Sequence, residues 1–337
     1  MMLNPLLRLN RLNRLSIARG AIAGVGDGEA YGVRYRDTGS GYAYERTGVL
    51  ADFSADTFVP DEVLPLQRQM RRCILNAEGE VEYYTDPLDT MYKEGGARSS
   101  VVEVLDVYSP HSQDIAWVRI NGAPDPAHIG SMIRLEDLSG TRAHYALIIG
   151  VDADVYLLSN PLLIDWGLGA DEKPCPTGII GDAKLDGSDG QLMVEVPGYY
   201  HRYIEGIDKT GPFAQLDMSR KPFPGADYMP PFYQSAMEGV ITDALGIPVD
   251  GWYGEWDEKN QVWENMSYTP LGLAMVSVVG FYPRTYVYRS DVRAKCAALG
   301  KVFHQQGFYN NLSLQYLMLV EAASFQTQAK FGDGIVD

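Results

Sequence analysis

The stretch from Asp291 to Asp337 constrains the fold most, because helical periodicity and capping chemistry agree there. Asp291 is suited to cap a short helix, and Gly300 is placed to end it. The apolar side of this helix carries Val292, Cys296 and Leu299. The sequence therefore predicts a short helix over 291–299.

A longer helix is predicted to follow Asn311, which can serve as its N-cap, and to run to Phe325. Apolar residues recur at the three- and four-residue steps of one helix face: Leu312, Tyr316, Leu319, Val320 and Ala323. Leu314, Leu317 and Met318 widen this surface. We therefore expect this helix to be packed on more than one side.

Elsewhere the chain consists of short alternating segments separated by turn residues, and its 337 residues include 35 Gly and 19 Pro. Short strands separated by frequent turn residues are typical of a β-rich globular protein. The segment 31–51 is predicted to form a hairpin, because Gly39-Ser40-Gly41 interrupts it and Tyr31, Val33 and Tyr35 share one face. Strands followed by two helices predict an α+β, β-rich fold.

From residue 93 to residue 181 the sequence pattern changes to short alternating runs separated by turn residues, and Gly95-Gly96 lies at the start of this segment. Its alternating runs are 101–107, 115–120, 132–135, 145–151 and 155–158. Short strands with regular turn signals predict a small β-sandwich or barrel. Such a unit could be a contact surface, or a structural elaboration with no separate role.

Three blocks of sequence, 65–75, 185–197 and 291–332, resemble one family in the expected order. The most specific is Asp186-Gly187-Ser188-Asp189-Gly190 with the strand that follows it to Pro197, and Met229-Pro230-Pro231-Phe232 adds a fourth match. These blocks look like the C-type-lectin-like (formylglycine-generating-enzyme-like) modules of bacteriophage tail and fibre proteins. The resemblance implies a module with two helices near its C-terminus. Such modules usually continue into a second lobe rich in Trp and Gly, which this chain would lack or receive from another chain.

Because family-like blocks lie on both sides of 93–181, that segment is interpreted as an insertion. The expected organisation is a basic N-terminal attachment arm at 1–20, a β-rich scaffold with the lectin-like module over 21–92 and 182–337, and an inserted small β-sandwich or barrel at 93–181.

The first twenty residues are basic, with Arg8, Arg11 and Arg14 alternating with leucines at a spacing of three. A three-residue step drifts around a helix, so it produces no long apolar stripe. Two interpretations stay open: an arm that is disordered alone, or an attachment arm that orders against an acidic neighbour in a particle.

The net charge of -16 makes nucleic acid an unsuitable partner, because binding phosphates requires a positive surface. The three cysteines, Cys73, Cys175 and Cys296, are expected to be free thiols, since their spacing fits neither a disulfide framework nor a metal motif. No apolar run approaches the roughly 20 residues that cross a bilayer. Arginines interrupt the N-terminal apolar stretch, so we expect synthesis in a cytoplasm without export or membrane insertion. The phage resemblance implies that this is the cytoplasm of a host bacterium.

Aromatic residues cluster at Trp252, Tyr253, Trp256 and Trp263. Aromatic rings beside carboxylates can stack on sugars, whereas core packing is their more common use. Glu255, Asp257 and Glu258 could supply a carboxylate pair for glycoside cleavage, or could be solvated acidic residues.

Motifs for enzymatic chemistry are not found, so neither catalytic residues, metal ligands nor a cofactor are predicted. The histidines are scattered: His111, His128, His144, His201 and His304. Asp152, Asp154 and Asp165 lack the glycine and the distal glutamate of a calcium loop, so a solvated loop is the better interpretation. The acidic turn 186–190 lacks the spacing of the helix-loop-helix calcium motif, and turn formation explains its residues.

The resemblance and the residues together predict a structural and adhesive protein of a bacteriophage virion: a tail fibre, spike or collar-type appendage. Its expected partners are other virion proteins, further copies of itself in a homo-oligomer such as a trimer, and a host surface glycan or protein. Two alternatives stay open: a glycan-active or lectin-fold enzyme, and a cellular variable ligand-binding protein built on the same module.

Overall fold

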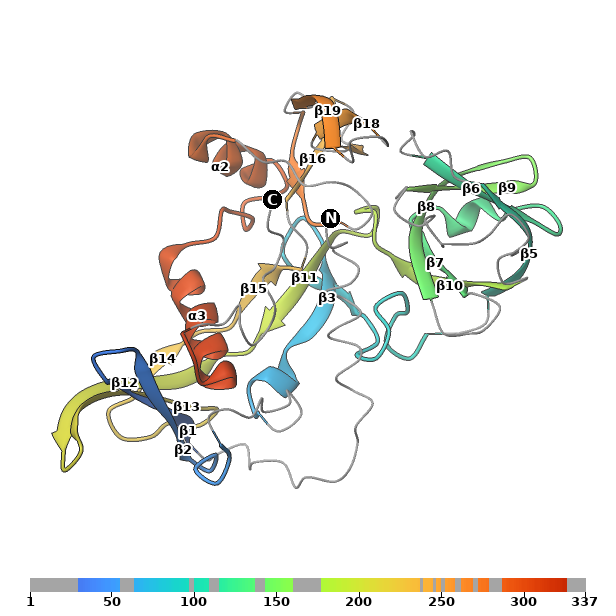
Figure 1. The fold of residues 1–337 in the computed structure, drawn as a ribbon. Helices are drawn as coiled ribbons and strands as arrows, with labels where there is room; N and C mark the ends of the chain where they lie inside the picture. Colours follow the sequence, from blue (N-terminus) through green and yellow to red (C-terminus); the bar gives the residue numbers. More distant parts are fainter. Residues whose placement is uncertain are drawn as a thin grey trace.

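The computed structural model describes residues 30–54, 64–96, 100–108, 115–136, 143–159, 177–236, 239–244, 247–249, 252–257, 262–268, 272–278 and 287–325. Most of these residues lie in strands, and two α-helices occur near the end of the chain (Figure 1). The predicted β-rich α+β class is therefore confirmed. Within the described ranges, no helix combines the length and the apolar character needed to span a bilayer.

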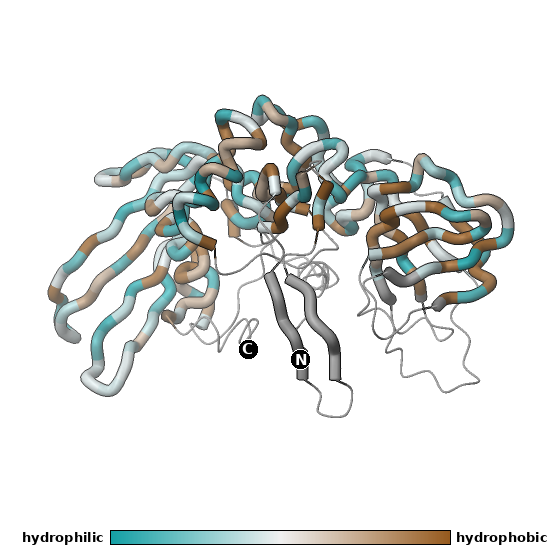
Figure 2. Tube along the Cα trace, turned by 90° about the horizontal axis from the view of Figure 1, so that it is seen from above, coloured by the Kyte–Doolittle hydropathy of each residue, from teal (hydrophilic) through white to brown (hydrophobic). Residues whose placement is uncertain are grey.

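A five-stranded antiparallel sheet lies at one end of the molecule, opposite the barrel described below (Figures 1 and 2). Its strands, in spatial order, are β14 (Asp227–Met229), β12 (Tyr199–Asp208), β13 (Gly211–Ser219), β1 (Tyr31–Asp37) and β2 (Tyr42–Gly48). β1 and β2 form the predicted hairpin, and Gly39 adopts a positive φ of 78° in its turn.

Helix α3 (Phe308–Ala322) packs on one face of this sheet, because alternation directs the apolar residues of three strands toward it. The shared core contains Tyr31, Val33, Tyr199, Leu216, Met218, Leu317 and Val320. The predicted cap, Asn311, is wrong: Gly307 is the N-cap, and the Asn311 N–H donates to the Gly307 carbonyl at 3.1 Å. The helix starts earlier than predicted, at Phe308. The prediction followed the buried helix face, and Phe308 and Tyr309 are exposed, so they lie outside that pattern.

A four-stranded sheet occupies the middle of the molecule, in the order β15 (Phe232–Ser235), β11 (Gln191–Val196), β3 (Arg71–Leu75) and β4 (Val81–Tyr84). A short 3-10 helix, η2 (Gln67–Gln69), precedes β3. The chain passes from β11 through Pro197 and Gly198 directly into β12, so one continuous stretch joins the middle sheet to the five-stranded sheet.

A closed barrel forms the other end of the molecule, and its strands run from Ser100 to Lys184, slightly past the segment 93–181 where the sequence predicts a small sandwich or barrel (Figure 1). Its strands are β5 (Ser100–Tyr108), β6 (Ile115–Ile120), β7 (Ser131–Glu136), β8 (Ala143–Asp152), β9 (Val155–Ser159) and β10 (Thr177–Lys184), with the 3-10 helix η3 (Pro126–His128) between β6 and β7. Hydrophobic and hydrophilic residues alternate along these strands (Figure 2). The inward set, which includes Val118, Ile133, Ile148 and Leu158, makes a separate core.

Three short strands, β16 (Val240–Thr242), β17 (Pro248–Val249) and β20 (Met275–Val276), form a small sheet, and β18 (Trp252–Asp257) pairs with β19 (Val262–Tyr268) in a hairpin. Helix α2 (Arg289–Ala297) packs near β20. Its N-cap is Tyr288, and Asp291 lies in the first turn. The prediction that Asp291 caps this helix is therefore wrong. Gly300 follows the helix, where an added Cβ would lie 2.1 Å from the Ala77 carbonyl oxygen.

Candidate functional site

The aromatic residues that the sequence singled out lie in the β18–β19 hairpin. Trp256 is opposite Trp263, Trp252 is opposite Tyr268, and Tyr253 is opposite Ser267. A register shift between Tyr253 and Glu255 interrupts the ladder. Sugar stacking by these rings stays a prediction, as does the carboxylate pair.

Arg8, Arg11 and Arg14, the predicted attachment residues, lie outside the described residues, as do Cys175, Asp165 and Glu258. Cys73 is a buried free thiol, and Cys296 is a half-buried one.

A groove of about 340 Å³ lies between α3 and the five-stranded sheet. Its lining comes from β1, β12 and β13 and from the C-terminal half of α3 with the turn after it: Tyr35, Tyr203, Leu216, Gln315, Tyr316, Met318, Leu319, Ser324 and Phe325. The groove exists because α3 covers only part of this sheet face. The β12–β13 hairpin continues past the helix, which leaves Ile207 82% exposed on the same face.

Phe325 is placed at the groove by a tight turn at the end of α3. Ala323 adopts a left-handed conformation with φ 46°, and its N–H donates to the Leu319 carbonyl at 2.9 Å. The Phe325 N–H then donates to the Tyr44 hydroxyl at 2.9 Å. The Phe325 ring makes edge contacts with Tyr35 at 4.7 Å and with Tyr42 at 5.2 Å between ring centroids. Phe325 is nevertheless 47% exposed, so part of its ring is open to a ligand.

Arg46 fixes the end of the helix against the sheet. Its guanidinium donates to the Val320 carbonyl at 2.7 Å and to the Glu321 carbonyl at 2.8 Å. These carbonyls belong to the last turn, where the helix dipole favours a cation. Burial lowers the pKa of Arg46, yet arginine remains charged at neutral pH. The groove wall is thus held by a buried, charge-assisted contact.

Hydroxyl groups form a polar edge along the groove. The Tyr203 hydroxyl donates to Glu205 Oε1 at 3.1 Å, and the Tyr35 hydroxyl lies 3.2 Å from the Tyr203 oxygen. Because the Tyr203 proton points to a carboxylate, Tyr35 is the donor in the second bond. The hydrogen bond with Tyr35 and burial both raise the pKa of Tyr203, so this phenol stays protonated at neutral pH.

The opposite face of the same sheet carries ion pairs. Arg36 pairs with Asp208, and Arg202 Nη2 lies 2.8 Å from Asp217 Oδ2. The Arg34 guanidinium stacks 4.3 Å above the Phe213 ring. Hydrogen bonds from Arg36 hold the pKa of Asp208 well below its usual range. The aromatic groove therefore belongs to one face only.

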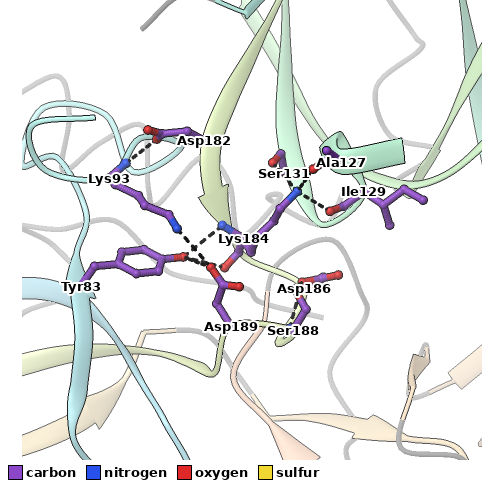
Figure 3. A network of polar contacts seen from close by, with 10 residues as sticks. All are labelled: Tyr83, Lys93, Ala127, Ile129, Ser131, Asp182, Lys184, Asp186, Ser188 and Asp189. Carbon is purple, nitrogen blue, oxygen red and sulfur yellow. Dashed lines mark hydrogen bonds and ion pairs between the residues drawn. The ribbon is translucent and has the colours of Figure 1, made fainter. Parts of the chain in front are cut away.

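A second cluster of polar groups joins the barrel to the four-stranded sheet (Figure 3). Lys184 Nζ, at the end of β10, donates to the Ala127 carbonyl, to the Ile129 carbonyl at 2.6 Å and to Ser131 Oγ at 3.1 Å. The Lys184 N–H donates to the Tyr83 hydroxyl at 3.0 Å. This cluster fixes where the chain leaves the barrel, which is a structural role.

The acidic turn 186–190 is explained by its own hydrogen bonds. Asp186 Oδ1 accepts from the Ser188 N–H at 3.0 Å, and Asp189 Oδ2 accepts from the Tyr83 hydroxyl at 3.1 Å and from Lys93 Nζ at 3.3 Å (Figure 3). Within the described part of the chain, no group of three or more His, Cys, Asp or Glu is arranged to hold a metal ion.

Sequence reasoning missed the groove. Two apolar faces are predicted, one from the alternation of Tyr31, Val33 and Tyr35 and one from the helical period of α3. These patterns do not predict that the helix covers only part of the sheet face, which is what leaves the groove open. In comparisons with known proteins, the chain matches no family model, no curated protein and no solved structure.

Proposed function

We propose that this protein is a structural and adhesive component of a bacteriophage virion, a tail fibre, spike or collar-type appendage that presents surfaces to partner subunits or to a host receptor. The observation that carries the proposal is the exposed aromatic groove between α3 and the five-stranded sheet, held on a packed β-framework. Binding residues that are fixed by a rigid scaffold lose little entropy when a ligand docks.

The arrangement of the family-like blocks supports this proposal. β3 and β11 come from two blocks that are more than a hundred residues apart, and they pair as neighbours, with Met193 opposite Cys73. Phe232 of β15, which belongs to the Met-Pro-Pro-Phe match, lies opposite Val196 of β11. Three of the blocks that resemble phage modules thus contribute to one sheet.

The proposed role includes attachment to the particle through the basic segment with Arg8, Arg11 and Arg14, and assembly into a homo-oligomer such as a trimer. The acidic charge of -16 keeps the surface unsuited to nucleic acid.

Mass spectrometry of gradient-purified virions tests the proposal. We expect the chain in particles at a fixed ratio to the major capsid protein, and antibody labelling at the tail or an appendage. The purified chain should also compete with phage for adsorption to host cells. Absence of the chain from purified particles would refute the virion role.

A further inference from the structure

The groove beside α3 is lined by nine side chains that are all uncharged. Tyr35, Tyr316 and Phe325 supply aromatic surface, and Leu216 at the floor is buried. An anion would find no cation among these nine residues, and it would face the Glu205 carboxylate at the edge. The charge of the lining therefore favours a neutral ligand.

The polar groups of the groove lie at its edges. Tyr35 and Tyr203 form a directed hydroxyl chain that ends on Glu205, so their oxygens retain acceptor capacity toward a ligand hydroxyl. The Gln315 side chain is exposed on the helix side and carries both an amide donor and an acceptor. Polar edges and aromatic walls together suit a ligand with hydroxyls around its rim and C–H groups on its faces.

A pyranose ring has this distribution of groups, and the volume of about 340 Å³ lies at the lower end of the roughly 300–1,000 Å³ of small-molecule sites. We propose that the groove between α3 and the five-stranded sheet binds a neutral carbohydrate of one or two pyranose rings. Phe325 and Tyr203, each close to half exposed, would stack on or flank the ring. This inference rests on the proposed adhesive function and names the ligand class of its groove.

Saturation-transfer NMR on the full chain tests the inference, with methyl α-mannopyranoside, methyl β-galactopyranoside, N-acetylglucosamine and maltose as probes. We expect at least one probe to receive saturation at millimolar concentration. Phe325→Ala should weaken its binding by about tenfold, because one aromatic contact is lost. Tyr203→Phe keeps the ring and removes the hydroxyl, and it should weaken binding by about fivefold.

The matched control is Tyr228→Ala on β14. Tyr228 is 55% exposed, and its ring contacts Tyr200 on the other face of the sheet with 5.0 Å between centroids, so its loss should leave saccharide binding unchanged. Thermal melting curves check that each variant is folded.

Three results would overturn the inference: no saturation of any probe, equal binding by the groove variants and the wild type, or self-association that Phe325→Ala abolishes. The last result would assign the groove to a second copy of the chain. The virion experiment is separate. Particles that contain the chain without saccharide binding defeat only this inference, whereas saccharide binding by a chain absent from particles defeats only the virion role.

Discussion

At the scale of single residues, Arg46 has the largest expected effect on stability. It is 2% exposed, and it satisfies two carbonyls of the last turn of α3 from the facing strand β2. Arg46→Met removes these two charge-assisted donors from the buried helix end, so we expect the free energy of unfolding to fall by about 2–3 kcal/mol in urea titrations. Arg46→Lys should recover only part of the loss, because an ammonium lacks the planar fork of donors.

Arg119→Met is the control for this prediction. Arg119 is 45% exposed and pairs with the exposed Asp154 at 3.2 Å, and such surface pairs contribute at most about 1 kcal/mol. Equal destabilisation by the two substitutions would show that Arg46 does not hold the helix end.

Single residues also show what the sequence can predict of the groove. The sequence predicts Tyr35 on one strand face and Leu319 on a helix face, and both residues line the groove. Phe325 was predicted as the end of the helix, but Ala323 turns the chain before it. A left-handed alanine is unfavourable by itself, so its conformation depends on tertiary contacts that no local pattern encodes.

At the scale of elements, apolar alternation predicts strands well and their partners poorly. The β1–β2 hairpin follows from a local turn, whereas β13, which pairs with β1 on its other side, lies about 180 residues later. Helix starts are predicted least accurately, because Gly307 and Tyr288 cap their helices without a side-chain hydrogen bond. The usual Ser, Thr, Asp or Asn signal is absent at both starts.

The junction at Lys184 gives a prediction at this scale. Lys184→Met removes the donors that tie β10 to the loop of η3, so that loop should open more often. Hydrogen exchange of the His128 and Ile129 amides, which donate to Asp125 and Pro126, should accelerate by about tenfold. Lys93→Met is the control, because it removes a partly exposed pair with Asp189 and none of the donors to the loop of η3. Unchanged exchange in Lys184→Met would contradict the role given to this lysine.

At the scale of the whole molecule, a third hydrophobic cluster connects the barrel to the four-stranded sheet. It joins Met132 and Leu147 of the barrel to Ile74 of β3 and Leu192 of β11. Two adjacent residues of β8 face different cores: Leu147 belongs to this connecting cluster, and Ile148 belongs to the barrel core. Either residue changed to alanine should cost about 2–4 kcal/mol.

Hydrogen exchange in increasing urea should distinguish these variants. Ile148→Ala should lower the protection of barrel peptides alone, whereas Leu147→Ala should also lower the protection of peptides from β3 and β11. The same protection pattern in both variants would show that the barrel and the sheet are not coupled through this cluster.

Buried phenols and a buried thiol should make the stability of the whole molecule fall at alkaline pH. Burial raises the pKa of Tyr199 and of Cys73, each to about 12, and it also raises the pKa of Tyr31 and Tyr83. In the unfolded chain tyrosine titrates near about 10 and cysteine near about 8.5. The unfolded state therefore releases these protons first, and the folded state is the one that retains them.

The direction of the pH effect follows from that difference. The stabilisation is fully present below about pH 8.5, and it is lost as the pH rises toward about 12, by up to about 1.4 kcal/mol per pH unit for each group. Urea titrations between about pH 7 and pH 11 should show a plateau and then a steepening fall. Tyr199→Phe lowers stability at every pH, because it removes the 2.6 Å hydrogen bond to Ser313. It should nevertheless make the fall above about pH 10 shallower, and an unchanged slope would mean that Tyr199 ionises as easily in the folded protein as in the unfolded chain.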